Sequence, residues 1–159
     1  MTREVLISAM KRSISDVLET MFFLPLEFAE NAENEEFWDS EKDELVVTKL
    51  NFRGPFSGFF IFIIPDELAL FLTASFMGED EESVTEDHIA GTVKEILNMI
   101  AGNIFSTLDN QIVFDLDIPE LIPLDEVGRT LPGTDEEISI LIETLDSRLA
   151  LTMVTCSDD

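Results

Sequence analysis

The longest amphipathic segment, at about residues 84–109, places the strongest constraint on how this sequence can fold. At about 100° per residue its apolar side chains fall on one broad helical stripe. The stripe consists of Ile89, Val93, Ile96, Leu97, Ile100, Ile104 and Leu108. A stripe this wide has to be buried against another layer of structure. The rest of the chain must therefore supply an apolar surface, and its composition predicts a β-sheet.

Several runs have the composition of β-strands. They span residues 44–54, 56–65, 111–118, 136–146 and 147–156. Gly54-Pro55 predicts a hairpin between the first two, and a second hairpin is expected to turn near Asp146-Ser147. The Phe-rich run 56–65 lacks clean alternation, which favours a central or interface strand.

Two further segments predict helices. Residues 4–24 have helical spacing and end before Pro25, and residues 66–78 end at Gly78. Ser83 and Glu86 have the spacing of a capping box at the start of the long helix. We therefore predict an α+β fold in one domain over residues 1–159, with an antiparallel sheet of about five to six strands covered by long helices on one face.

The charge of the chain restricts its partners. It has 34 acidic and 9 basic residues, a formal net charge of -25. Such a charge repels nucleic acids and anionic membranes, so neither is an expected partner. It leaves open a partner with a basic face, or a surface that serves only solubility. The start of the chain turns polar too early for a signal peptide, and the run 56–65 is too short to cross a bilayer, so we expect a cytoplasmic protein.

Few residues offer catalytic or metal-binding chemistry of their own. Cys156 is the only cysteine and His88 the only histidine, so the sequence predicts neither a disulfide nor a metal site. His88 is expected to be a solvated residue of the first helical turn. Trp38, in the charged loop 30–44, could contact a partner or pack under the domain.

The outward face of the long helix carries an unusual pattern. Glu95 and Asn98 lie three residues apart and are surface neighbours, with Gly91 one turn before Glu95 and Gly102 one turn after Asn98. Each glycine inside a helix costs about 1 kcal/mol relative to alanine. A bare backbone around one carboxylate and one amide favours a docking helix that another molecule approaches closely. The alternative is that Glu95 and Asn98 are ordinary solvated residues.

The same residues resemble a family signature. Glu95-x-x-Asn98 followed by Met99, Ala101 and Gly102, with Pro119 21 residues after Asn98, is similar to the signature of the CheC/CheX family, and closest to CheX. That family dephosphorylates the chemotaxis response regulator CheY. Its members often have Asp or Ser where this chain has Gly91.

The resemblance implies a catalytic role for Glu95 and Asn98, and partner contact at Gly91 and Gly102. CheC-type members carry a second Glu/Asn pair, but here Phe22 takes the asparagine position three residues after Glu19, which implies one site per chain. It further implies a phosphorylated CheY-like partner that holds the Mg²⁺, no cofactor in this chain, and a homodimer. Two alternatives stay open: a module that binds receiver domains or a scaffold without catalysis, and an unrelated acidic structural subunit.

Overall fold

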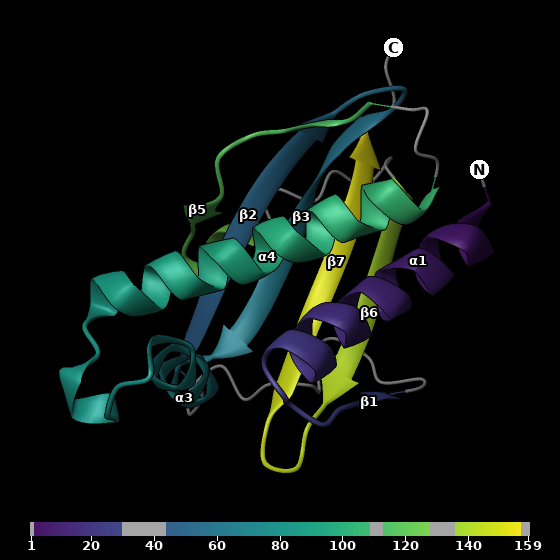
Figure 1. Ribbon diagram of the computed structural model, residues 1–159. Helices are drawn as coiled ribbons and strands as arrows, with labels where there is room; N and C mark the ends of the chain where they lie inside the picture. The colour runs from purple at the N-terminus through teal and green to yellow at the C-terminus, as the bar shows by residue number, and fades with distance from the viewer. Residues whose placement is uncertain (1, 30–43, 109–112, 128–135, 157–159) are drawn as a thin grey trace.

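The computed structural model describes residues 2–29, 44–108, 113–127 and 136–156 (Figure 1). Of the charged loop expected at 30–44, everything except Glu44 lies outside the described residues, Trp38 included. The helical elements are α1 (Arg3–Ser15), η1 (Asp16–Met21), α3 (Asp66–Met77), η2 (Glu81–Ser83), α4 (Glu86–Leu108) and η3 (Leu124–Glu126). The strands are β1 (Glu27–Ala29), β2 (Leu45–Arg53), β3 (Ser57–Pro65), β4 (Asp115–Leu116), β5 (Glu120–Leu121), β6 (Glu136–Glu143) and β7 (Arg148–Cys156).

All described strands form one antiparallel sheet. Its order is β1-β6-β7-β3-β2-β4, and β5 also pairs with β2. Both predicted hairpins are confirmed, and the Phe-rich strand β3 lies centrally, between β2 and β7. The described sheet has seven strands where five to six were expected. The short strands β1 and β5 escaped the sequence pattern because two or three residues show no alternation. Strand β4 covers only Asp115–Leu116 of the strand expected at 111–118, of which 111–112 lie outside the described residues.

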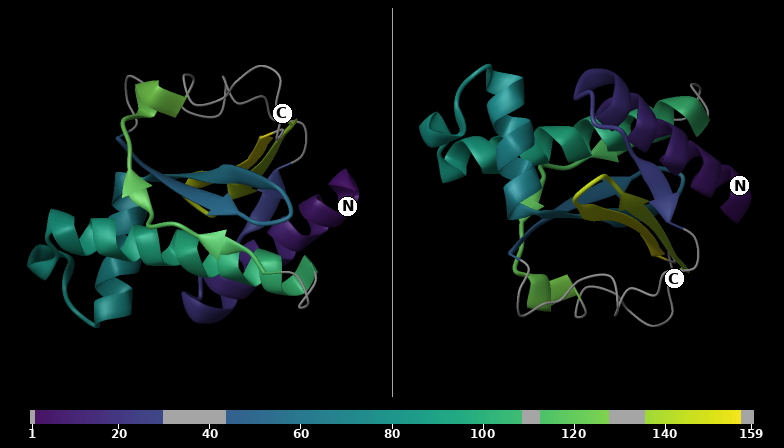
Figure 2. Two further views of the ribbon diagram at one scale, coloured as in Figure 1. Left: turned by 90° about the horizontal axis from the view of Figure 1, so that it is seen from above. Right: turned by 90° about the horizontal axis from the view of Figure 1, so that it is seen from below.

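Helices α1, α3 and α4 cover one face of this sheet (Figures 1 and 2). The predicted α+β class is thus confirmed. Alternate residues of β3 point to opposite faces. Phe60, Phe62 and Ile64 join the main core beneath the helices. Phe59, Ile61 and Ile63 form a second cluster on the opposite face, under the segment that contains η3.

Helix α4 buries the stripe that its sequence predicts. Val93, Ile96, Leu97, Ile100 and Ile104 are fully buried, and the two ends of the stripe pack against the same core. The burial of five large aliphatic side chains contributes about 10 kcal/mol before entropy losses. The helix is therefore held rigidly on the sheet, and its opposite face is fixed in direction.

The prediction that Ser83 and Glu86 form a capping box is wrong, because other residues cap the helix. Helix α4 begins at Glu86, and Thr85 caps it. The Thr85 N–H donates to Nδ1 of His88 at 3.1 Å, and the His88 N–H donates to Oγ1 of Thr85 at 3.2 Å. This is a reciprocal cap with an imidazole in the place of the usual Glu. His88 lies exposed in the first turn, as expected, and serves as this cap.

The first helix does not run unbroken to Leu24. After Ser15 the chain continues as the π-helical turn η1 and closes with Leu24 N–H donating to the Leu18 carbonyl at 2.9 Å. Phe23, between them, has φ 54°, a left-handed conformation that favours glycine. A bulky residue held there costs on the order of 1–3 kcal/mol.

Candidate functional site

The outer face of α4 forms a ridge with few side chains. Glu95 is exposed, and Asn98, one turn further on, is half-buried. Gly91 is exposed and Gly102 is half-buried. A Cβ atom built on either glycine meets nothing within 4 Å. The ridge therefore presents one carboxylate and one amide with open space beyond each glycine.

We expect Gly102→Ala to raise the free energy of unfolding by about 1 kcal/mol, because alanine favours the helix and the added methyl group meets no neighbour. Gly91→Ala should behave in the same way. Urea denaturation of the two variants measures this, and a lower midpoint for both would contradict the open ridge.

One flank of the ridge faces α1. Buried Ser13 of α1 donates from Oγ to Oδ1 of Asn103 at 3.1 Å. Asn103 therefore has a structural role on α4. Met99 lies one turn before Asn103 and one turn after Glu95, so it connects the ridge to this flank. Met99 also packs against the main core.

The other flank faces the chain segment that follows α4. Phe105, two turns after Asn98, is buried, and its ring stacks on that of Phe114 with centroids 4.0 Å apart. The segment continues to β5 with half-buried Pro119, and β5 contacts α4. Asn98 is half-buried because it lies on the side of α4 that this segment approaches.

An aromatic cluster fixes α4 to the sheet at this end. Phe52 of β2 lies 5.0 Å from Phe105 and 6.2 Å from Phe114 between ring centroids, and 5.3 Å from Phe60 of β3. These tilted and edge-on contacts add to the burial of the rings. Aromatic packing thus accounts for the Phe residues here, and the ridge is positioned by a rigid support.

The position that carries a second Glu/Asn pair in CheC-type proteins has no amide here. Glu19 is exposed in η1, but Phe22 is buried at the end of that turn. Its ring stacks on Phe76 of α3, with centroids 5.6 Å apart. Phe22 is part of the packing between η1 and α3, and the position offers no polar group for chemistry.

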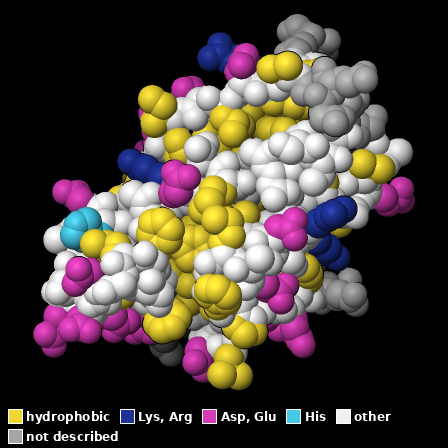
Figure 3. All heavy atoms as spheres, viewed as in Figure 1, with side chains coloured by type: hydrophobic (Ala, Val, Ile, Leu, Met, Phe, Trp, Pro, Cys, Tyr) yellow, Lys and Arg dark blue, Asp and Glu magenta, His cyan; other side chains and the backbone are white. Residues whose placement is uncertain are grey.

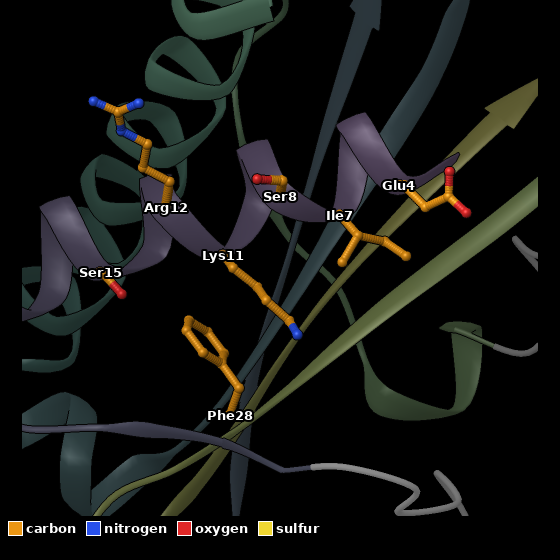
Figure 4. Close-up of a pocket in the computed structure, with 7 residues that line it drawn as sticks. All are labelled: Glu4, Ile7, Ser8, Lys11, Arg12, Ser15 and Phe28. Carbon is orange, nitrogen blue, oxygen red and sulfur yellow. The ribbon is translucent and has the colours of Figure 1, made fainter. Parts of the chain in front are cut away.

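Two cavities lie along α1, away from the ridge. One, of about 500 Å³, is lined by residues of α1 and by Phe28 of β1 (Figure 4). Lys11 extends toward Phe28, with Nζ 5.6 Å from the ring centroid, while Arg12 points away from it. The other, of about 370 Å³, lies between the start of α1 and the end of α4. Neither of these two cavities includes Glu95 or Asn98.

Across residues 2–29, 44–108, 113–127 and 136–156, no three His, Cys, Asp or Glu side chains gather as metal ligands would. No described helix is both long and apolar enough to cross a bilayer. Cys156, the single cysteine of the sequence, is half-buried at the end of β7.

Comparison with solved structures identifies relatives with the same fold. A CheX from Borrelia burgdorferi, solved as a complex with CheY, BeF₃ and Mg²⁺, has a TM-score of 0.72 and 22% identity over 95% of this chain and 97% of that one. A CheC-like superfamily protein from Shewanella sp. PV-4 has a TM-score of 0.74 and 20% identity over 99% and 100%. CheX from Vibrio vulnificus has a TM-score of 0.73 and 17% identity over 95% and 96%.

Sequence comparison gives the family. No curated protein sequence matches the chain significantly. The family model described as chemotaxis phosphatase CheX matches residues 46–143, which is more than half of the 159-residue chain. The matched region contains the whole of α4 with Glu95, Asn98 and both ridge glycines, and it extends past Pro119. The chain therefore belongs to the CheX family.

Proposed function

We propose that this protein is a phosphatase that hydrolyses the phospho-aspartate of a CheY-like response regulator, with Glu95 and Asn98 as its catalytic residues. The observation that carries the proposal is the pair of exposed Glu95 and half-buried Asn98, one turn apart on a rigid helix with open glycine positions on both sides. Family membership and a relative that forms a complex with CheY support the choice of partner.

An outward-facing helix ridge can enter the active site of another protein, so it fits a reaction whose substrate is held by the partner. Phosphoryl transfer depends chiefly on positioning and on charge stabilisation. The phospho-aspartate and the Mg²⁺ beside it belong to the receiver domain, so this chain has to supply only a docked pose and an oriented water. The open positions at Gly91 and Gly102 allow the receiver's loops to approach the backbone of α4 closely.

Asn98 performs the chemical step. Its amide oxygen accepts a hydrogen bond from a water, and its amide nitrogen donates one to the phosphoryl group. The water oxygen attacks phosphorus in line with the bond to the aspartyl oxygen, and that bond breaks. The products are inorganic phosphate and the free aspartate carboxylate, and the water's proton passes to solvent. Correct orientation of a reacting water supplies several kcal/mol of the barrier reduction.

Glu95 holds the docked pose. An ionised carboxylate only accepts hydrogen bonds. In the docked complex Glu95 accepts one from the ammonium group of the receiver's active-site lysine. Such a charge-assisted bond is stronger than a neutral one and fixes the register of the two proteins. Glu95→Ala should therefore raise the KM for the phosphorylated receiver more than it lowers kcat.

Phosphate release tests the proposal directly. CheY-type receivers from the source organism are phosphorylated with a small acyl phosphate donor in the presence of Mg²⁺. Wild-type protein should accelerate phosphate release from at least one of them above the receiver's own rate. Binding without acceleration would instead identify the non-catalytic receiver-binding module. The homodimer that the family resemblance implies and the cytoplasmic location expected from the sequence stay predictions, and sedimentation velocity measures the first.

A further inference from the structure

Exposed hydrophobic side chains gather beside α4, over the region where η1 and α3 meet (Figure 3). The stacked rings of Phe22 and Phe76 join these two elements. Met21 and Phe23 flank Phe22 in sequence, and Phe76 and Met77 come from the last turn of α3, and all four are exposed. Phe23 is 83% exposed and Phe76 59%. We call Met21, Phe23, Phe76 and Met77 the η1–α3 patch.

This patch is continuous with the catalytic ridge. The hydrogen bond from Ser13 to Asn103 marks the flank of α4 that faces α1. Met99 lies on the same flank, one turn before Asn103 and one turn after Glu95. Helix α4 packs against both α3 and η1 on this side. A molecule seated over Glu95 therefore extends onto the patch across Met99.

Phe23 is kept exposed at a cost in backbone strain. Its left-handed φ of 54° suits glycine or asparagine, and its ring is largely in solvent. Strained positions of this type cluster at binding sites, where contacts made on binding compensate for them. The combination of strain and exposure in an aromatic residue points to a binding role, since aromatic side chains are the commonest energetic anchors of interfaces.

The η1–α3 patch could bind either a second copy of this chain or a receiver domain, and the charge of the chain favours the receiver. A second copy of this protein would bring its own net charge of -25 to the contact, so a homodimer through this patch would need charged contacts to offset the repulsion between the two copies. None of the four patch residues carries a charge that could offset this repulsion. The opposite flank of the ridge differs in carrying charge, because exposed Asp117 and Glu120 lie there beside exposed Ile118.

We propose that the η1–α3 patch binds an apolar surface of the receiver domain next to its phosphorylation site, and so strengthens the binding of the receiver to the ridge. This inference rests on the proposed function, because it takes the receiver as the partner of the ridge. The patch contributes affinity, and Asn98 contributes the chemistry. Phe23 and Met21 act as binding residues and touch none of the reacting atoms.

Phe23→Asn tests the patch without disturbing the fold. Asparagine accepts the left-handed conformation, so the variant should fold at least as stably as wild type. Its affinity for a CheY-type receiver activated with beryllofluoride and Mg²⁺ should fall about tenfold. Met21→Gln provides an independent test in the same patch. Leu145→Asn is the matched control, because Leu145 is 96% exposed in the β6–β7 turn, outside the patch.

The results separate this inference from the proposed function. Weaker binding by Phe23→Asn and Met21→Gln, with kcat at saturating receiver unchanged, supports the patch. Wild-type affinity in both variants overturns it, while the effect of Asn98→Ala on hydrolysis still decides the proposed function. Loss of a dimer in sedimentation, with receiver affinity unchanged, also overturns it and assigns the patch to a second copy. A fourth outcome is that the patch variants bind the receiver more weakly although the wild-type protein releases no phosphate. This outcome supports the role of the patch in binding and refutes the proposed phosphatase activity.

Discussion

Asn98→Ala should abolish the acceleration of phosphate release and leave receiver binding intact. The amide of Asn98 is the only group to which the proposed mechanism assigns the attacking water. Loss of one positioned hydrogen-bonding group from a catalytic site typically lowers kcat by roughly 10²–10³-fold. Asn98 is half-buried on α4, and alanine is the better helix former, so the variant should fold at least as stably as wild type. Single-turnover phosphate release with saturating protein measures the effect on the chemical step.

Asn103→Ala is the matched control for this prediction. Asn103 lies on the same helix, but its side chain accepts the hydrogen bond from buried Ser13. Its loss should cost about 1 kcal/mol of stability and leave phosphate release unchanged wherever the variant is folded. If Asn98→Ala retains wild-type kcat, or if Asn103→Ala loses activity to the same extent, the assignment of the water to Asn98 is wrong.

The main features of the fold follow from the sequence because they depend on long periodic patterns. The stripe from Ile89 to Leu108 predicted both the helix and its buried face, and the structure confirms both. The Phe-rich run 56–65 predicted the central strand because a run in which Ser57 is the one polar side chain needs cover on both faces. Once the buried face of α4 is fixed, the direction of its glycine positions follows from helix geometry.

Features that depend on tertiary contacts could not be predicted in this way. An α-helix and a π-helical turn bury nearly the same residues over a single turn, so the spacing of Val17 and Leu18 did not reveal η1. Strand β1 exists because it pairs with β6, and its own three residues show no pattern. The cap at Thr85 depends on the imidazole of His88, which sequence rules do not list as a capping partner.

The η1–α3 patch could not be predicted from the sequence for a related reason. Met21, Phe23 and Phe76 belong to apolar runs that predict a core, and only the packing of η1 against α3 through Phe22 leaves them in solvent. An exposed aromatic residue can be recognised only after the layers are assembled. The proposed site residues could therefore be chosen from the sequence of α4 alone, whereas the surface beside them required the structure.

Gly58→Ala should have the largest effect on stability. Gly58 lies in β3, between Phe52 of β2 and Thr155 of β7. A Cβ atom built at this position falls 1.9 Å from the Val154 carbonyl oxygen. That atom belongs to the backbone of the neighbouring strand, so no side-chain rotation relieves the clash and β3 has to separate from β7. We expect a loss of about 3 kcal/mol or more, equivalent to a fall in Tm on the order of 10 °C.

The contrast with the ridge glycines makes this prediction specific. Gly58 is closely approached by the backbone of β7, whereas Gly91 and Gly102 face open space, so alanine should destabilise the first and stabilise the other two. Thermal unfolding followed by circular dichroism, with all three variants in one buffer, measures the difference, and an equal Tm for all three would refute it. Because β3 supports the core beneath α4, phosphate release by Gly58→Ala should fall only in proportion to the unfolded fraction. Asn98→Ala should show the reverse behaviour, with full stability and no activity, and the pair thereby separates the support of the ridge from its chemistry.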